Sequence, residues 1–239
     1  MARRLFFVEE VHSGRAEIKG DEAGHLTRVL RVEKGHRYEI SDNQQLYLAE
    51  VEVARKEHVV FQVLEKLPPR PLPVRVHLLA ALIKFDHFEW MLEKATELGV
   101  ERVTPIAATR SEHGLDKAAF KRSERWRKIL KESAQQCRRA HLPALGPVAS
   151  WKHVPAVEEG LRLLLDEAPG TSPLLRALPT PRLASDCVQL LVGPEGGWTD
   201  DERAAFGAAG WQAVSLGPLV LRAETAAISG LSIIGAAWL

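Results

Sequence analysis

Two short segments in the C-terminal third of the chain carry residue types suited to ligand binding. The first is Gly193-Pro194-Glu195-Gly196-Gly197, which follows the apolar residues 190–192. Its glycines let the backbone approach a ligand closely and adopt positive φ. Unlike a P-loop, the segment is not followed by a lysine, and its glycine spacing differs from the G-x-G-x-x-G dinucleotide pattern. Because an acid repels phosphate, the segment favours a ligand with hydroxyls, amines or positive charge. A glycine-rich turn without a ligand is the alternative.

The second segment is Leu216-Gly217-Pro218-Leu219-Val220-Leu221-Arg222-Ala223-Glu224-Thr225-Ala226. Residues 219–221 are apolar where a polar connection is expected, and Arg222 and Glu224 follow closely. This composition suits a wall around a flat organic group with two polar contacts. In the alternative interpretation, Arg222 and Glu224 pair with each other and cap the following helix.

Both segments fall between a predicted strand and a predicted helix. Apolar runs predict strands at 74–82, 103–107, 161–165, 187–192 and 214–216. Helical spacing predicts helices at 86–98, from 123 to about 139, and at 224–238, and a capping box at Thr199–Glu202 opens another that ends near Gly210. This alternation implies an α/β fold with a mostly parallel sheet covered on both faces. Ligands of such sheets bind beyond the carboxyl ends of the strands, where both segments lie.

The N-terminal part has a different pattern. Strand-like runs at 4–9, 16–20, 38–40, 46–53 and 59–64, with a short helix capped by Asp21 and ending at Leu30, predict a small barrel-like domain. Four prolines at 67–73 predict a stiff linker. We therefore expect a domain at 1–66, a linker at 67–73 and a second domain at 74–239.

The overall composition is that of a globular protein: 239 residues, 46% hydrophobic, 26% charged and a net charge of +1. Cys137 and Cys187 are too few for a disulfide framework or a cysteine-rich metal site, and the nine histidines show no metal-ligand spacing, so no metal is predicted. The apolar run at the start is too short for a signal peptide, and 226–239 is too short to span a membrane. We expect a cytoplasmic protein.

The charges are unevenly distributed. Residues 110–152 contain eleven Lys/Arg and four Asp/Glu, whereas beyond Lys152 there are five arginines, no lysine and ten acids. This asymmetry indicates two surfaces with different partners. In the alternative interpretation, the basic residues of 121–131 form only the solvated face of one helix.

The two segments resemble the RsmE family of 16S ribosomal RNA uridine-N3 methyltransferases, which belongs to the SPOUT superfamily. The similar residues are Leu191-Val192 with the first segment, and Leu216-Gly217-Pro218 with 221–226. Further blocks are similar along nearly the whole chain, at 3–7, 25–31 with Gly35, 93–100, 104–105, 110–111 and 136–139 with Pro143. This sequence departs from the family at Leu219, where an arginine is usual, and around Phe85 and His87, where a glycine and a basic residue are usual.

The resemblance implies a PUA-like RNA-binding β-barrel followed by a SPOUT domain with a trefoil knot that holds S-adenosylmethionine. The residues that would bind this cofactor are Leu165, Leu191, Gly193, Pro194, Glu195, Gly196, Gly197, Leu216, Gly217, Leu221, Arg222, Thr225 and Ala226. Arg222 would stabilise charge on the uracil oxygens, and Glu224 or Glu195 would accept the N3 proton or position another group. Glu195 as a residue that only shapes its loop is the alternative.

The resemblance also implies a homodimer that acts on one uridine in the decoding region of 16S ribosomal RNA in the small subunit. We then expect the basic segment at 110–152 to contribute to RNA binding. The expected RNA-binding residues are Arg3, Arg28, Arg31, Lys84, Arg110, Gln136, Arg138 and Arg139. A catalytically idle RNA-binding protein of the same fold and a nucleotide-binding metabolic enzyme are the competing interpretations.

Overall fold

The computed structural model describes residues 4–156 and 160–239, which divide into two compact units. Unit 1 comprises Met1–Pro71 and Ala134–Leu142, and unit 2 comprises Leu72–Ser133 and Pro143–Leu239. The chain therefore crosses from unit 2 into unit 1 and back again in its middle.

Unit 1 is built on a five-stranded sheet in the order β1-β3-β4-β5-β2. β1 pairs with β3 in parallel, and the other pairs are antiparallel. Alternate residues of these strands face a core with Phe61 and Ile40 at its centre, which helix α1 also covers through Leu26. The elements are β1 (Leu5–Phe7), β2 (Arg15–Lys19), α1 (Gly20–Arg28), β3 (Arg37–Ser41), β4 (Leu46–Arg55) and β5 (His58–Lys66).

Unit 2 contains an eight-stranded sheet whose strand pairings are parallel throughout the described residues, as the strand–helix alternation predicts. The strand order is β11-β13-β10-β12-β6-β7-β8, with β9 also pairing with β7. The strands are β6 (Arg75–Ala81), β7 (Arg102–Ala107), β8 (Ala144–Leu145), β9 (Ala149–Ser150), β10 (Leu161–Leu165), β11 (Ser172–Pro173), β12 (Cys187–Val192) and β13 (Gln212–Ser215).

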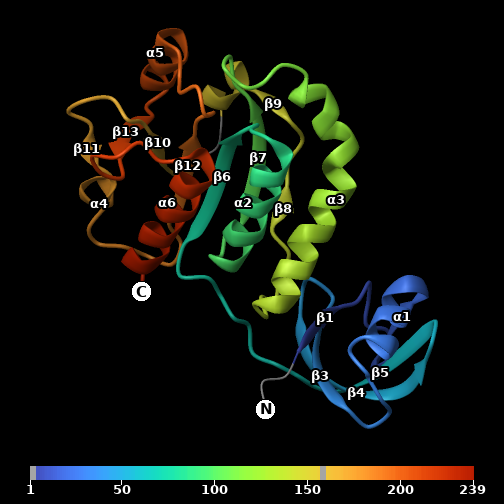
Figure 1. Cartoon of the computed structure of the whole chain (residues 1–239). Helices are drawn as coiled ribbons and strands as arrows, with labels where there is room; N and C mark the ends of the chain where they lie inside the picture. Colours follow the sequence, from blue (N-terminus) through green and yellow to red (C-terminus); the bar gives the residue numbers. More distant parts are fainter. Residues whose placement is uncertain (1–3, 157–159) are drawn as a thin grey trace. The chain divides into compact units, whose positions relative to one another are not determined.

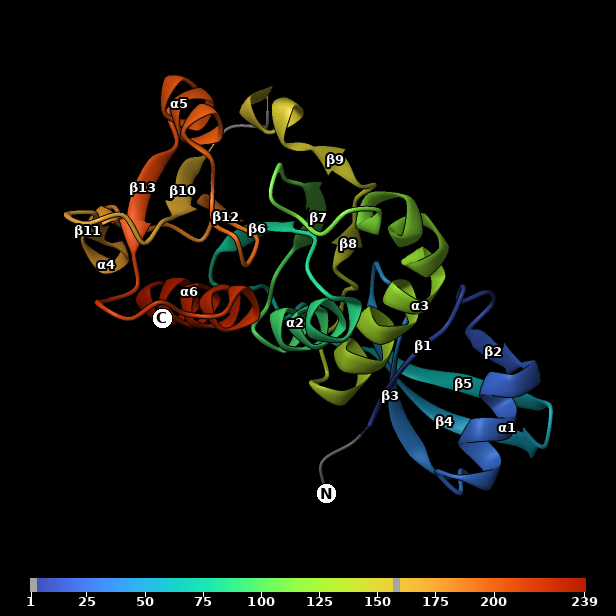
Figure 2. The same cartoon turned by 45° about the horizontal axis from the view of Figure 1, so that its top comes forward.

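Helices cover both faces of this sheet (Figures 1 and 2). α2, α3 and α6 lie on one face, where Phe88, Trp126 and Ile234 are buried against the strands. α5 and the 3-10 helix η1 lie on the other, around Trp198 and Phe206. The helices are α2 (Phe85–Glu97), α3 (Leu115–Gln136), η1 (Trp151–Ala156), α4 (Leu174–Ala177), α5 (Asp200–Ala208) and α6 (Ala223–Ala237).

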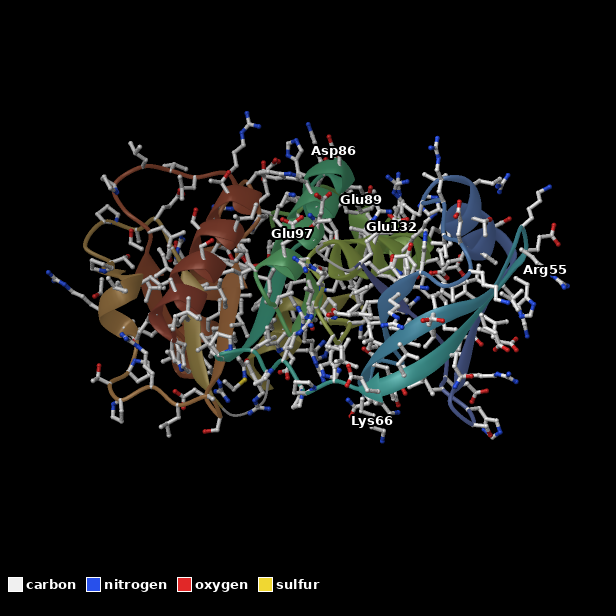
Figure 3. All side chains as sticks on the ribbon, turned by 90° about the horizontal axis from the view of Figure 1, so that it is seen from below. Arg55, Lys66, Asp86, Glu89, Glu97 and Glu132 are labelled. Atoms are coloured by element: carbon white, nitrogen blue, oxygen red, sulfur yellow. The ribbon has the colours of Figure 1, made fainter. Side chains whose placement is uncertain are left out.

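Part of the basic strip on α3 pairs with the neighbouring helix. Glu89 of α2, labelled in Figure 3, accepts hydrogen bonds from Arg122 at 3.2 Å and from Arg125 at 2.8 Å. The side chain of Glu89 is only 11% exposed. These two arginines therefore hold α3 against α2, and they are less available to another partner than a freely solvated helix face would be.

The structure differs from the sequence predictions at several elements. α3 begins at Leu115, eight residues before the predicted start at Ser123. Asp21 is not the cap of α1: the N-cap is Lys19, and Asp21 lies in the first turn, where an acid favours the helix dipole. The short elements β8, β9, η1, β11 and α4 were not predicted. No helix in the described ranges is long and apolar enough to cross a membrane.

Candidate functional site

The two segments singled out in the sequence line one pocket in unit 2. The pocket lies beyond the carboxyl ends of β10, β12 and β13, where a parallel sheet binds its ligands. Residues 193–197 form one wall and residues 216–221 the other. Nine residues expected to bind the cofactor line it: Leu165, Gly193, Pro194, Glu195, Gly197, Leu216, Gly217, Leu221 and Ala226.

Glycine is required at two places in the first wall. A Cβ on Gly193 would lie 2.9 Å from Nε1 of Trp198, whose buried indole donates a hydrogen bond to the Leu165 carbonyl. Gly197 has a φ of +69°, a conformation that L side chains rarely adopt. The glycines therefore allow the backbone to turn tightly over the buried indole ring.

Two polar side chains brace this wall. The Arg110 guanidinium donates to the Gly196 carbonyl at 2.9 Å. Glu202, whose side chain is fully buried, accepts from the Thr109 and Thr199 backbone N–H groups, each at 2.8 Å. The Glu202 carboxylate and the Thr199 hydroxyl complete the predicted capping box of α5. Burial raises the pKa of Glu202, but the hydrogen bonds from Thr109 and Thr199 outweigh it and leave that pKa below its ordinary value.

The second wall is apolar and exposed. Leu219 and Val220 are 77% and 78% exposed although they line the pocket. The wall leads into α6, whose N-cap is Arg222 with no side-chain capping bond. Within the described residues no ion pair joins Arg222 to Glu224, so the interpretation in which they pair and cap the helix is wrong. Glu224 is instead buried, and its Oε1 lies 3.6 Å from Nδ1 of His87.

The charged lining of the pocket was not found from the sequence. Asp166 and Glu167 follow β10 and line the pocket together with Arg203 of α5. Arg203 donates to both oxygens of Asp166, at 2.7 and 3.2 Å, which raises the pKa of the guanidinium. Counting Glu195, the pocket holds three carboxylates and one guanidinium, so it favours a ligand that carries positive charge. The sequence signal that could have revealed Asp166 and Glu167 is the pair of acids directly after a buried strand.

Four residues expected at the cofactor lie outside this lining: Leu191, Gly196, Arg222 and Thr225. Leu191 belongs to the core on the α5 face, because alternate residues of a strand face opposite sides and its neighbour Val192 takes the pocket side. Gly196 lies against the Arg110 side chain.

The candidate RNA-binding residues lie in both units. Arg28, Arg31, Gln136, Arg138 and Arg139 belong to unit 1, whereas Lys84 and Arg110 belong to unit 2. Arg31 and Arg138 have positive φ, at 51° and 57°. All the described candidates except the half-buried Arg139 are exposed, as RNA contact requires: Arg28, Arg31, Lys84, Arg110, Gln136 and Arg138. Arg3 lies outside the described residues.

Comparison with known proteins agrees with this architecture. Residues 70–235 match the RNA methyltransferase domain, and residues 18–64 match the RNA methyltransferase PUA domain. The ribosomal RNA small subunit methyltransferase E of Bacillus subtilis is 34% identical over 91% of this chain and 88% of its own length. Its counterpart in Synechocystis is 34% identical over 99% of this chain and 78% of its own length.

Two of the similar solved structures cover nearly the whole chain. The ribosomal RNA small subunit methyltransferase E of Neisseria gonorrhoeae, bound to S-adenosyl methionine, is 25% identical with a TM-score of 0.89, over 99% of this chain and 98% of that one. A putative methyltransferase of Legionella pneumophila in complex with the same cofactor is 29% identical, with the same TM-score and coverage.

A parallel sheet with an acidic, glycine-walled pocket at its carboxyl edge, together with a PUA domain, defines an RNA-modifying enzyme of the α/β class. Because the matches to this family cover nearly the whole chain, the chain belongs to the ribosomal RNA small subunit methyltransferase E family.

Proposed function

We propose that this protein transfers a methyl group from S-adenosylmethionine to N3 of one uridine in the decoding region of 16S ribosomal RNA. The observation that carries the proposal is the convergence of residues 193–197 and 216–221 on one pocket in a chain of this family. Family members bind this cofactor, as the Neisseria protein does.

The pocket fits S-adenosylmethionine in its charge and its walls. Glu167 and Glu195 favour a positively charged sulfonium and ammonium, and they disfavour the phosphates of a nucleotide. The apolar side chains at 219–221 suit the flat adenine ring. When bound, the cofactor supplies an electrophilic methyl group on a sulfonium sulfur. We propose that the two walls also form the trefoil knot expected for the SPOUT superfamily.

Uracil N3 carries a proton at neutral pH, and residues of this chain must remove it for methyl transfer to occur. We assign its removal to Glu224, with Arg222 stabilising negative charge on the uracil carbonyl oxygens. Glu224 is buried, and its Oε1 lies 3.6 Å from Nδ1 of His87. Glu195, half exposed at the pocket, faces the same histidine as Glu224.

We propose that unit 1 and the exposed basic residues of unit 2 bind the RNA. Along the sequence, we propose domains at 1–66 and 74–239 joined by a linker at 67–73, with Ala134–Leu142 of the second domain packing into unit 1. We also propose that the protein is a homodimer and acts in the cytoplasm. Its substrate is the assembled small subunit or the RNA of that subunit. Phosphate contacts release counterions, so we expect the RNA affinity to fall steeply with salt concentration. An affinity independent of salt contradicts this part.

The experiment that tests the function supplies labelled S-adenosylmethionine and small subunits from cells that lack the enzyme, followed by nucleoside analysis. We expect N3-methyluridine at one site. Cofactor binding without transfer to subunits or RNA would favour an idle RNA-binding protein, and absence of cofactor binding would overturn the proposal. The Arg222→Ala variant should bind cofactor but lose turnover; full turnover would remove Arg222 from the mechanism.

A further inference from the structure

His87 lies among three carboxylates that come from three elements of unit 2. Its Nδ1 is 3.6 Å from Oε1 of Glu224 at the start of α6 and 3.8 Å from Oε1 of Glu195 in the first pocket wall. Its Nε2 is 3.8 Å from Oδ2 of Asp86, its neighbour on α2. The proposed function as stated gives His87 no role.

Two polar atoms in this cluster lack partners. Within the described part of the chain, His87 Nδ1 and Glu224 Oε2 are both shielded from solvent and make no hydrogen bond. Leaving a buried polar group unpartnered costs stability, so the arrangement does not serve the folding of the protein. The Nδ1–Oε1 separation of 3.6 Å exceeds a hydrogen bond only slightly, and a small side-chain rotation would bring the two into the range for proton transfer.

The cluster connects the protein interior to its surface. The exposed fraction of the side chain rises from 6% at Glu224 to 32% at His87 and 78% at Asp86. Asp86 lies at the N-terminal end of α2, at the outside of the molecule in Figure 3. An imidazole accepts a proton on one nitrogen and releases one from the other, so its two nitrogens can serve the two ends of this line.

We propose that His87 carries the proton away from Glu224 to solvent during methyl transfer. This inference rests on the proposed function and on Glu224 as the proton acceptor. The N3–H bond breaks, its electron pair stays on N3 and forms the bond to the methyl carbon, and the S–C bond pair stays on sulfur. The proton passes from the Glu224 carboxyl to His87 Nδ1, and the Nε2 proton then leaves to water beside Asp86. Because His87 is not among the residues that line the pocket and acts through Glu224, it is a positioning residue.

A second explanation is that His87 serves only as a positive charge between Glu195 and Glu224. The two roles make opposite demands. A relay requires a neutral imidazole at the start of the cycle, whereas charge compensation requires the protonated form. A lysine at this position would satisfy charge compensation, but it stays protonated at neutral pH and cannot relay.

The test compares the wild type with His87→Ala, His87→Gln and His87→Lys in single-turnover methylation of unmodified small subunits. Rates are measured from about pH 5.5 to about pH 9, which spans imidazole titration. His153→Ala is the matched control, since it removes an exposed histidine of η1 that does not line the pocket. Calorimetry with S-adenosylmethionine and melting curves accompany each variant.

We expect all three His87 variants to lose about tenfold to 100-fold in rate, at the low end of general acid–base effects, with unchanged cofactor affinity. Because protonation blocks an imidazole relay, the wild-type rate should fall toward acid pH, and this fall should be absent from His87→Ala and His87→Gln. Added imidazole should restore part of the His87→Ala rate. Among the described residues, the ionisable groups in contact with the ring are Asp86, Glu195 and Glu224. Glu224→Gln should abolish turnover because it removes the proposed proton acceptor.

A wild-type rate and pH profile in His87→Ala would overturn the inference, and so would full activity in His87→Lys. If one variant melts early, His87→Gln, which keeps a polar side chain of similar length, decides the outcome. If the wild-type protein binds the cofactor but forms no N3-methyluridine, the proposed function itself is overturned. If the wild-type protein is active and the His87 variants are equally active, only the role of His87 is overturned.

Discussion

The two walls of the pocket are built differently although both connect a strand to a helix. In the wall at 193–199, the Trp198 indole bonds to the Leu165 carbonyl, Arg110 to the Gly196 carbonyl, and buried Glu202 to two backbone N–H groups. In the wall at 216–221, Leu219 and Val220 are mostly exposed, and among the described residues the side-chain hydrogen bonds of this wall are those between Ser215 Oγ and the Gly217 backbone.

This difference indicates that the two walls contribute to ligand binding in different ways. The first wall is preorganised, so the ordering of its backbone is completed during folding and not when the ligand binds. The second wall leaves apolar side chains in water, and a ligand that covers them gains from their burial. We therefore expect changes in the first wall to alter stability and cofactor binding, and changes in the second to alter binding alone.

Trp198→Ala should give the largest effect. Trp198 is 2% exposed and its ring lies 5.0 Å from that of Phe206, so truncation leaves a large cavity beneath the first wall. We expect a loss of about 3–5 kcal/mol in the free energy of unfolding of unit 2. Urea unfolding followed by circular dichroism measures it, with Leu219→Ala as the matched control in the second wall. Equal losses in the two variants would refute the contrast between the walls.

Glu202→Gln should give the next effect, and one that depends on pH. Because the pKa of Glu202 is lowered in the folded protein, the ionised carboxylate stabilises the fold above its unfolded pKa. That stabilisation disappears as the pH falls through the folded pKa. We expect Glu202→Gln to be destabilised by about 1–3 kcal/mol near neutral pH, and by less in acid.

The measurement for Glu202→Gln is the melting temperature of both proteins from neutral pH down into the acid range. Their curves should converge as the pH falls. Asp201→Asn, which alters an exposed acid in the same first turn of α5, provides the control. A constant difference between Glu202→Gln and wild type at every pH would show that the charge of Glu202 is not what braces the wall.

Arg110→Ala separates bracing from RNA binding. The sequence predicts an RNA contact for Arg110, whereas the structure shows its guanidinium bonded to the Gly196 carbonyl. If bracing dominates, loss of this bond should weaken S-adenosylmethionine binding by about threefold to tenfold and lower the stability by about 0.5–1.5 kcal/mol. Calorimetry with the cofactor and filter binding with RNA give the two affinities. A loss confined to RNA affinity would instead support the sequence prediction.

Local patterning predicted the sheet well because each strand is a short buried apolar run. Residues 161–165 and 187–192 are strands with the predicted bounds, and the capping box at Thr199 is confirmed. α3 was predicted to start too late because residues 115–122 are mostly charged or small and show little apolar periodicity. Strands of two residues, such as β8 and β11, are too short to show any period.

The pocket was predictable where residue type alone shapes the backbone, as at Gly193 and Gly197. The pairing of Asp166 with Arg203 was not, because these residues meet only when β10 and α5 are packed. The position of His87 beside Glu224 has the same origin: α2 and α6 are separated in the sequence by most of unit 2. Contacts between distant elements require the fold, and sequence periodicity does not contain them.

Leu219→Arg should give the smallest effect and is the sharpest test of the second wall. Leu219 is 77% exposed, so replacing it leaves no cavity, and we expect melting to change by no more than surface substitutions do, about 0.5 kcal/mol. An arginine is usual here in the family, and its charge would add one phosphate or cofactor contact. An RNA contact would raise the RNA affinity by about threefold to tenfold at low salt and steepen its salt dependence by about one charge. Leu219→Gln, which adds a polar side chain without charge, is the control. If Leu219→Arg changes neither RNA nor cofactor affinity, the second wall does not touch either ligand at this position, and its exposed side chains need another explanation.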